Sequence, residues 1–66
     1  MKINKLKGKI VENGMSHPQF AAKIGMNYST LNRKLKNPEK ITVGDAAKMK
    51  AALNLSNDKA CEIFLT

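Results

Sequence analysis

Residues 16–35 read SHPQFAAKIGMNYSTLNRKL and carry the signals of two short helices separated by a tight turn. Ser16 and Gln19 form a capping-box pattern, in which the two side chains satisfy backbone groups at the start of a helix. The apolar residues that follow share one face of this helix, which we expect to end near residue 24: Phe20, Ala21 and Ile24. Gly25 interrupts the helix, because glycine adopts the left-handed backbone conformation without steric cost.

A second helix is predicted over residues 28–36. Asn27 is a favoured N-cap residue, and Leu31 and Leu35, four positions apart, form the buried stripe of this helix. Pro38 ends it, because the residue before a proline avoids the helical region. Since so few residues join the two helices, we expect them to cross almost at right angles, with the second helix projecting from the domain.

The outward side of the second helix carries side chains suited to reading base edges. Advancing about 100° per residue from Leu31 places four polar residues on this side: Ser29, Asn32, Arg33 and Lys36. Arg33 can pair with guanine O6 and N7, Asn32 can pair with adenine N6 and N7, and the Ser29 hydroxyl can donate or accept. Tyr28 projects from the first turn and offers its ring to a thymine methyl group or its hydroxyl to a phosphate. We therefore expect this helix to enter the major groove of B-DNA, which is roughly 12 Å wide.

Residues 16–35 resemble the helix-turn-helix of phage repressors and Cro proteins, and the resemblance extends over nearly the whole chain. It implies a small all-α domain of five helices that acts as a prophage-type transcriptional regulator. By position, the resemblance assigns base contacts to Tyr28, Ser29, Asn32 and Arg33. It assigns backbone-phosphate contacts to His17, Asn27, Lys36 and Lys40. Two positions depart from the family: His17 stands where glutamine is usual, and Lys34 stands where an apolar anchor is common.

Three further helices are predicted outside this pair. The first ends at Asn13-Gly14 and has the apolar stripe Ile3, Leu6 and Ile10. After a loop over residues 38–41, a second capping box at Thr42 opens a helix whose expected inward residues are Val43, Ala46, Met49 and Leu53. Ser56 caps a last helix with the apolar stripe Ala60, Ile63 and Phe64. No segment alternates with period two, so the sequence predicts five short helices and no strand in a single domain over residues 1–66.

The charge of the chain points to a polyanionic partner. Twelve Lys and Arg residues stand against five Asp and Glu residues, which gives a net charge of +7 over 66 residues. All of the excess lies in residues 1–40, which hold nine basic and two acidic residues, whereas residues 41–66 hold three of each. This segregation predicts one cationic face and one structural or interaction face.

Several classes of function are excluded by what the sequence lacks. One histidine, one cysteine and five scattered carboxylates offer no pair with the spacing for catalysis or for a metal site, so we expect a non-enzyme without cofactor or metal. Cys61 has no partner for a disulfide, which fits a cytoplasmic protein, and we expect it to be a buried or half-buried small hydrophobic residue. We expect neither an export signal nor a membrane span, because the longest apolar run is three residues.

The leading hypothesis is therefore a repressor that binds a palindromic double-stranded DNA operator as a homodimer, with half-sites about 34 Å apart, and excludes polymerase sterically. Ordinary alternatives remain for each feature. Residues 19–35 can be a plain helical hairpin, and Lys2, Lys5, Lys7 and Lys9 can be a solvated face from which only one or two residues approach phosphate. A second function class is a protein-interaction module, antitoxin-like or antirepressor-binding, that uses Ile63, Phe64 and Leu65; these three can equally close the core. Binding to anionic lipid is disfavoured, because the first helix lacks a large aromatic-bearing apolar face.

Overall fold

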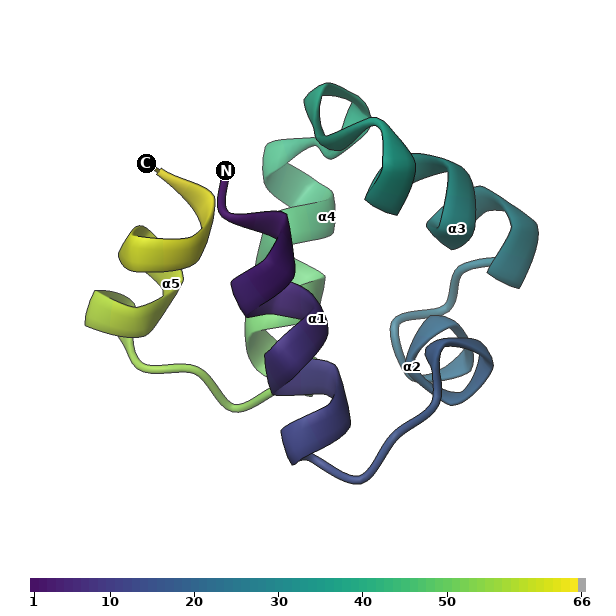
Figure 1. Cartoon of the computed structure of the whole chain (residues 1–66), viewed down its shortest axis with the longest axis horizontal. Helices are drawn as coiled ribbons and strands as arrows, with labels where there is room; N and C mark the ends of the chain where they lie inside the picture. The colour runs from purple at the N-terminus through teal and green to yellow at the C-terminus, as the bar shows by residue number, and fades with distance from the viewer. Residues whose placement is uncertain (66) are drawn as a thin grey trace.

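Five α-helices and one short 3-10 turn make up the computed structural model, which describes residues 1–65 (Figure 1). Their bounds are α1 (Ile3–Glu12), α2 (His17–Lys23), α3 (Tyr28–Lys36), η1 (Pro38–Lys40), α4 (Val43–Ala52) and α5 (Asn57–Phe64). No strand occurs in residues 1–65, so the prediction of an all-α fold with five helices is confirmed. The segment expected as a loop over residues 38–41 contains the turn η1, in which Lys40 N–H donates to the carbonyl of Asn37 at 2.9 Å.

The helices begin where the sequence places their caps. Ser16 Oγ accepts from Gln19 N–H at 3.3 Å, and Gln19 Oε1 accepts from Ser16 N–H at 2.9 Å, which completes the predicted capping box of α2. Thr42 caps α4 by a second box, and Ser56 caps α5 through a single hydrogen bond of 3.2 Å from Lys59 N–H. Each cap satisfies backbone donors that the first turn of a helix otherwise leaves unpaired.

Helices α1 and α2 each end near a glycine with a positive φ angle, as the sequence predicts. Gly14 has φ +73° and Gly25 has φ +70°, a region that residues with a Cβ rarely adopt. At the end of α1, the N–H groups of Gly14 and Met15 return to the carbonyls of Val11 and Ile10 at 2.9 and 3.2 Å. Both chain reversals therefore follow from local backbone chemistry.

Side chains from all five helices meet in one core, with the following buried members: Leu6, Ile10, Phe20, Ala21, Ile24, Leu31, Leu35, Met49, Leu53 and Ile63. In Figure 1, α5 lies on one side of α1 and the α2–α3 pair lies on the other. The N-terminal segment is tied to α5 by a hydrogen bond of 2.9 Å from Lys2 N–H to the carbonyl of Ile63. The core thus holds α2 and α3 at one side of the molecule.

The expected inward face of α4 is wrong at Val43, which is 89% exposed, whereas Met49 and Leu53 are buried and Ala46 is half-buried. At about 100° per residue, Val43 lies roughly 120° away from Met49 around the helix, outside the buried stripe. The position that completes the stripe, four residues before Met49, is Asp45, the only charged or polar residue in residues 1–65 that is buried. A pattern of apolar residues alone could not identify it.

The expectation for Cys61 is also wrong, because its side chain is exposed. Cys61 lies two residues before the buried Ile63 and therefore on nearly the opposite side of α5. The sequence left open whether Ile63, Phe64 and Leu65 close the core or bind a partner. In the structure, Ile63 belongs to the core, Phe64 is half-buried against it, and Leu65 is 77% exposed.

Candidate nucleic-acid interface

The connection between α2 and α3 spans only residues 24–27. Met26 N–H donates to the carbonyl of Ala21 at 2.8 Å, and Gly25 N–H donates to the carbonyl of Ala22 at 3.1 Å, so the chain turns sharply as α2 ends. In Figure 1, α2 is viewed almost along its axis while α3 is seen from the side, so the two helices cross steeply. Ala21 and Leu31, which the sequence predicts on the apolar faces of the two helices, are both buried. The two helices are therefore joined by a tight turn and share the core; that they form a DNA-binding helix-turn-helix stays a prediction.

The start of α3 and the side that it buries follow from its own sequence. Asn27 Oδ1 accepts a hydrogen bond of 2.8 Å from Ser29 N–H and caps the helix, and Leu31 and Leu35 bury its inner side. Ser29 and Arg33 are exposed on the outer side, and Tyr28, in the first turn, keeps 46% of its accessible surface. Asn32 is half-buried, as its position about 100° from Leu31 requires.

The four residues expected at phosphates occupy three different places. Lys36 ends α3 and Lys40 ends η1, and both are exposed next to the turn that joins these two elements. Asn27 is exposed at the start of α3, where its Oδ1 is engaged in the cap and its Nδ2 remains a donor. His17 stands apart from the other three, half-buried in the first turn of α2.

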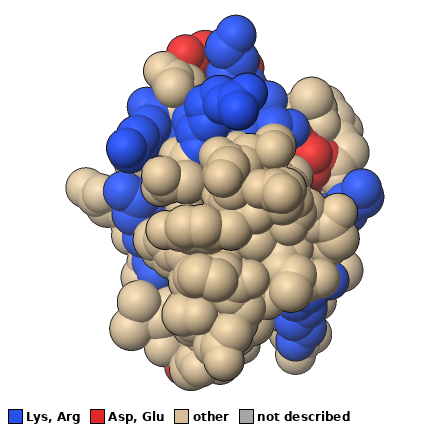
Figure 2. All heavy atoms as spheres, turned by 90° about the vertical axis from the view of Figure 1, so that its right-hand side faces the viewer, with Lys and Arg blue, Asp and Glu red and all other residues tan. Residues whose placement is uncertain are grey.

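Positive charge lies at the rim of this face rather than at its centre. Figure 2 views the side of the molecule where α2 and α3 lie, and it shows a broad neutral middle with Lys and Arg gathered along the upper edge. That edge corresponds to the end of α3 and to η1 in Figure 1. The last turn of α3 supplies Arg33, Lys34 and Lys36, and η1 adds Lys40. Cations in the last turn also interact favourably with the helix dipole.

One residue of this basic turn points inward, which sequence reasoning missed. Lys34 Nζ forms an ion pair with Asp45 Oδ2, and the same oxygen accepts from Thr42 N–H at 3.1 Å. The hydrogen bond from Lys34, opposed in part by burial, holds the pKa of Asp45 below its ordinary value. The available signal was the departure of Lys34 from the apolar anchor of the family, combined with an aspartate in the buried stripe of α4.

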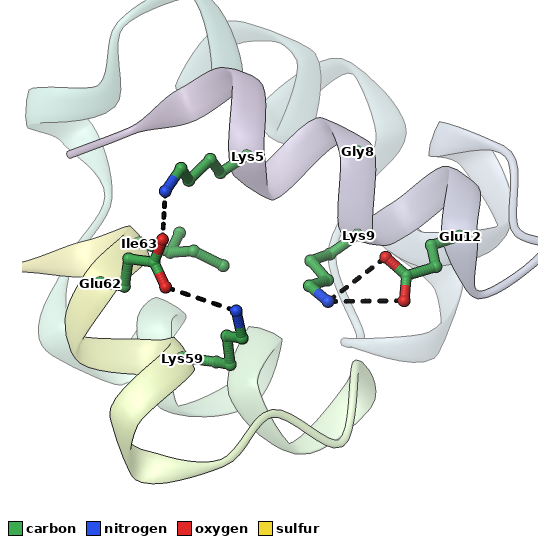
Figure 3. A pocket seen from close by; sticks show the side chains of 7 residues that line it. All are labelled: Lys5, Gly8, Lys9, Glu12, Lys59, Glu62 and Ile63. Atoms are coloured by element: carbon green, nitrogen blue, oxygen red, sulfur yellow. Dashed lines mark hydrogen bonds and ion pairs between the residues drawn. The ribbon is translucent and has the colours of Figure 1, made fainter.

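Two lysines of α1, Lys5 and Lys9, are less available to phosphate than an evenly solvated face implies. An open cavity of about 260 Å³ lies between α1 and α5. Figure 3 shows the residues that line it: Lys5, Gly8, Lys9, Glu12, Lys59, Glu62 and Ile63. Lys9 Nζ lies 3.2 Å from Glu12 Oε2, and Lys5 pairs with Glu62, which Lys59 approaches at 3.5 Å. The hydrogen bond from Lys5 holds the pKa of Glu62 below its ordinary value. These ammonium groups are therefore matched by carboxylates of the same domain.

Comparison with known proteins adds no assignment, since no family model, curated protein or solved structure matches this chain. Within residues 1–65, no group of three or more His, Cys, Asp or Glu side chains could hold a metal ion. None of the helices described here combines the length and the apolar character needed to cross a membrane.

Proposed function

We propose that this protein is a sequence-specific double-stranded DNA-binding regulator of transcription, a repressor similar to phage repressors and Cro proteins. The observation that carries the proposal is the outer side of α3, where Ser29 and Arg33 are exposed and Arg33 belongs to the cationic edge of a largely neutral surface. In protein–DNA complexes, many cations contact the phosphates beside a groove, while arginine and neutral polar side chains read base edges inside it. The arrangement of neutral centre and basic rim suits that division.

In the proposed complex, α3 lies in the major groove with its first turn toward the bases. Arg33 pairs with a guanine, Ser29 and Tyr28 contact neighbouring base edges, and Asn32 reads an adenine at the side of the groove. Lys36 and Lys40 hold one phosphate backbone, and Asn27 Nδ2 and His17 hold the other. None of these proposed contacts requires a cofactor.

Repression in this account is steric, by a homodimer that covers a palindromic operator and excludes polymerase. The Cα trace of one copy measures 27 × 25 × 19 Å, so two copies fit side by side on half-sites about 34 Å apart. An apolar groove between α4 and α5 supports such a contact. It encloses about 300 Å³ and is lined by Val43, Ala46, Ala47, Lys50, Asn57, Ala60, Cys61, Phe64 and Leu65. As a DNA-bound regulator, the protein would act in the cytoplasm at the nucleoid.

The same groove favours the second candidate function, a module that binds another protein. Val43 and Leu65, 89% and 77% exposed, place apolar surface next to the half-buried Phe64. Its residues come from the part of the chain that carries no net charge, and most of them are apolar, which suits the core of a protein-binding face. One side of this groove, α5, lies across α1 from the α2–α3 pair (Figure 1).

Selection of bound duplexes from a random pool tests the first proposal. We expect the enriched sequences to be palindromic, with half-site centres about 10 base pairs apart or a multiple of that spacing. Enrichment of no sequence, with equal retention of heparin and of every duplex, would overturn DNA readout. Loss of a protein partner but not of DNA in Phe64→Ala would instead assign the α4–α5 groove to the second function.

A further inference from the structure

The ion pair between Lys34 and Asp45 connects the last turn of α3 to the first turn of α4. The side chains of Lys34 and Asp45 are 20% and 12% exposed, so the pair is shielded from solvent on most sides. Its acceptor is fixed independently of Lys34, because the capping box of α4 holds Asp45 through Thr42 with hydrogen bonds of 3.0 and 3.1 Å. Lys34 therefore meets a carboxylate that is already held in place.

We propose that Lys34 and Asp45 are positioning residues that set the rotation of α3 about its own axis, and so determine how selectively its outer side reads DNA. This inference rests on the proposed function. It differs from a general electrostatic role, in which each basic residue at the end of α3 simply attracts phosphate.

The placement of Lys34 around α3 supports a positioning role. Around the helix axis, Lys34 lies about 60° to one side of Leu31 and Leu35 about 40° to the other. The ion pair therefore adds a contact beside the buried leucines, on the inner side that holds α3 against the rest of the domain. Ser29 and Arg33 lie about 160° and 200° from Leu31, on the opposite side. Any rotation that the anchor permits therefore displaces the base-reading side chains by the same angle.

The charges around the pair separate it from the cationic rim. Lys34 is neutralised by Asp45, whereas the other basic residues of this last turn, Arg33 and Lys36, are exposed. Substitution of either partner removes the same charge–charge attraction but changes the net charge of the protein in opposite directions. Positioning and simple attraction therefore predict results of different sign.

The experiment compares Lys34→Met with Asp45→Asn, using the selected duplex and a random duplex of equal length. Asp45→Asn retains the cap of α4, because the oxygen of the introduced amide can still accept from Thr42 N–H. We expect both variants to lower the ratio of selected to random affinity by about tenfold, roughly the discrimination of one base pair. Lys34→Arg should retain the ratio, and Lys48→Met, which removes an exposed charge from α4, should leave it unchanged.

A different pattern would overturn the inference. If Lys34→Met weakens and Asp45→Asn strengthens binding to both duplexes equally, the pair acts through charge alone. All measurements are made at a temperature where circular dichroism shows each variant folded, so that loss of fold does not imitate loss of selectivity.

Hydrogen exchange of the free protein tests the anchor without DNA, so failure of the inference can be distinguished from failure of the proposed function. We expect the amide protons of Leu35 and Asn37, which are bonded at the end of α3, to exchange about tenfold faster in both variants than in Lys48→Met. Unchanged exchange would mean that the pair does not hold α3. If exchange is faster in both variants but the parent protein prefers no duplex, the ion pair does hold α3, and only the proposed reading of DNA is refuted.

Discussion

Asn27 Oδ1 accepts a hydrogen bond of 2.8 Å from the backbone N–H of Ser29, so the residue that starts α3 is bonded to one expected to read a base. The cap fixes where the helix begins, and it leaves Asn27 Nδ2 as a donor on the exposed surface. The Asn27 side chain thus caps α3 through Oδ1, and its proposed contact with phosphate uses Nδ2 of the same group.

Asn27→Asp separates these two roles. Aspartate caps a helix as well as asparagine does and interacts favourably with the helix dipole, so we expect the free energy of unfolding to stay within about 0.5 kcal/mol. DNA affinity should fall for all sequences, because the donor is lost and a negative charge faces phosphate. Asn27→Ala should instead destabilise the fold by about 1 kcal/mol. Urea unfolding and duplex titration measure the two effects, and undiminished affinity in Asn27→Asp would remove Asn27 from the interface.

Arg33→Ala and Lys36→Ala distinguish base contact from phosphate contact on one helix. We expect Arg33→Ala to cost about 1–3 kcal/mol of binding free energy on the selected duplex and to relax preference at a single base pair. Lys36→Ala should weaken all duplexes alike and make the slope of log K against log salt shallower by about 1. Titrations at several salt concentrations check both. The same loss for both variants on selected and random DNA would contradict direct readout by α3.

The ion pair of Asp45 should make stability depend on pH in the acid range. Because Lys34 keeps the folded-state pKa of Asp45 below the ordinary value of 3.8, the folded protein binds fewer protons than the unfolded chain there. The stabilisation is therefore full above that value and is lost as the pH falls through the folded-state pKa. We expect Asp45→Asn to be about 1–3 kcal/mol less stable than the parent at pH 7 and to approach it at about pH 2. Urea unfolding across this range is the measurement, and a constant difference would exclude the charge of Asp45 as its cause.

Val43→Ser tests the apolar groove between α4 and α5 without disturbing the core. Val43 is 89% exposed and lines the groove, so its substitution should change the free energy of unfolding by no more than about 0.5 kcal/mol. We expect it to weaken dimer formation on a two-half-site duplex, measured by sedimentation. Val11→Ser is the matched control, since Val11 is 69% exposed and does not line the groove. Equal effects of the two substitutions would rule out the groove as the contact between copies.

The sequence predicted those features of the fold that depend on near neighbours. The caps at Ser16, Asn27 and Thr42 and the positive angles at Gly14 and Gly25 each involve residues within a few positions of one another. Periodic apolar residues then identified most of the core, because helical spacing determines which side is buried.

Contacts between distant residues could not be predicted in this way. Lys34 and Asp45 are 11 positions apart and Lys5 and Glu62 are 57 apart, and each residue alone is typical of a solvated surface. Val43 was misplaced because an apolar side chain in the first turn of α4 was assigned to the core, although a charged residue occupies that face. In the candidate interface, the outward side chains of α3 followed from periodicity, whereas the distribution of charge around them required the folded arrangement.

Methylation protection at guanine N7 tests most directly whether α3 reads DNA from the major groove, where N7 is exposed. On a selected duplex, we predict protection of at least one guanine in each half-site by the parent protein. We further predict loss of that protection in Arg33→Ala at concentrations that restore full occupancy. Full occupancy by the parent protein without protection of any guanine N7, or protection that persists in Arg33→Ala, would contradict the account.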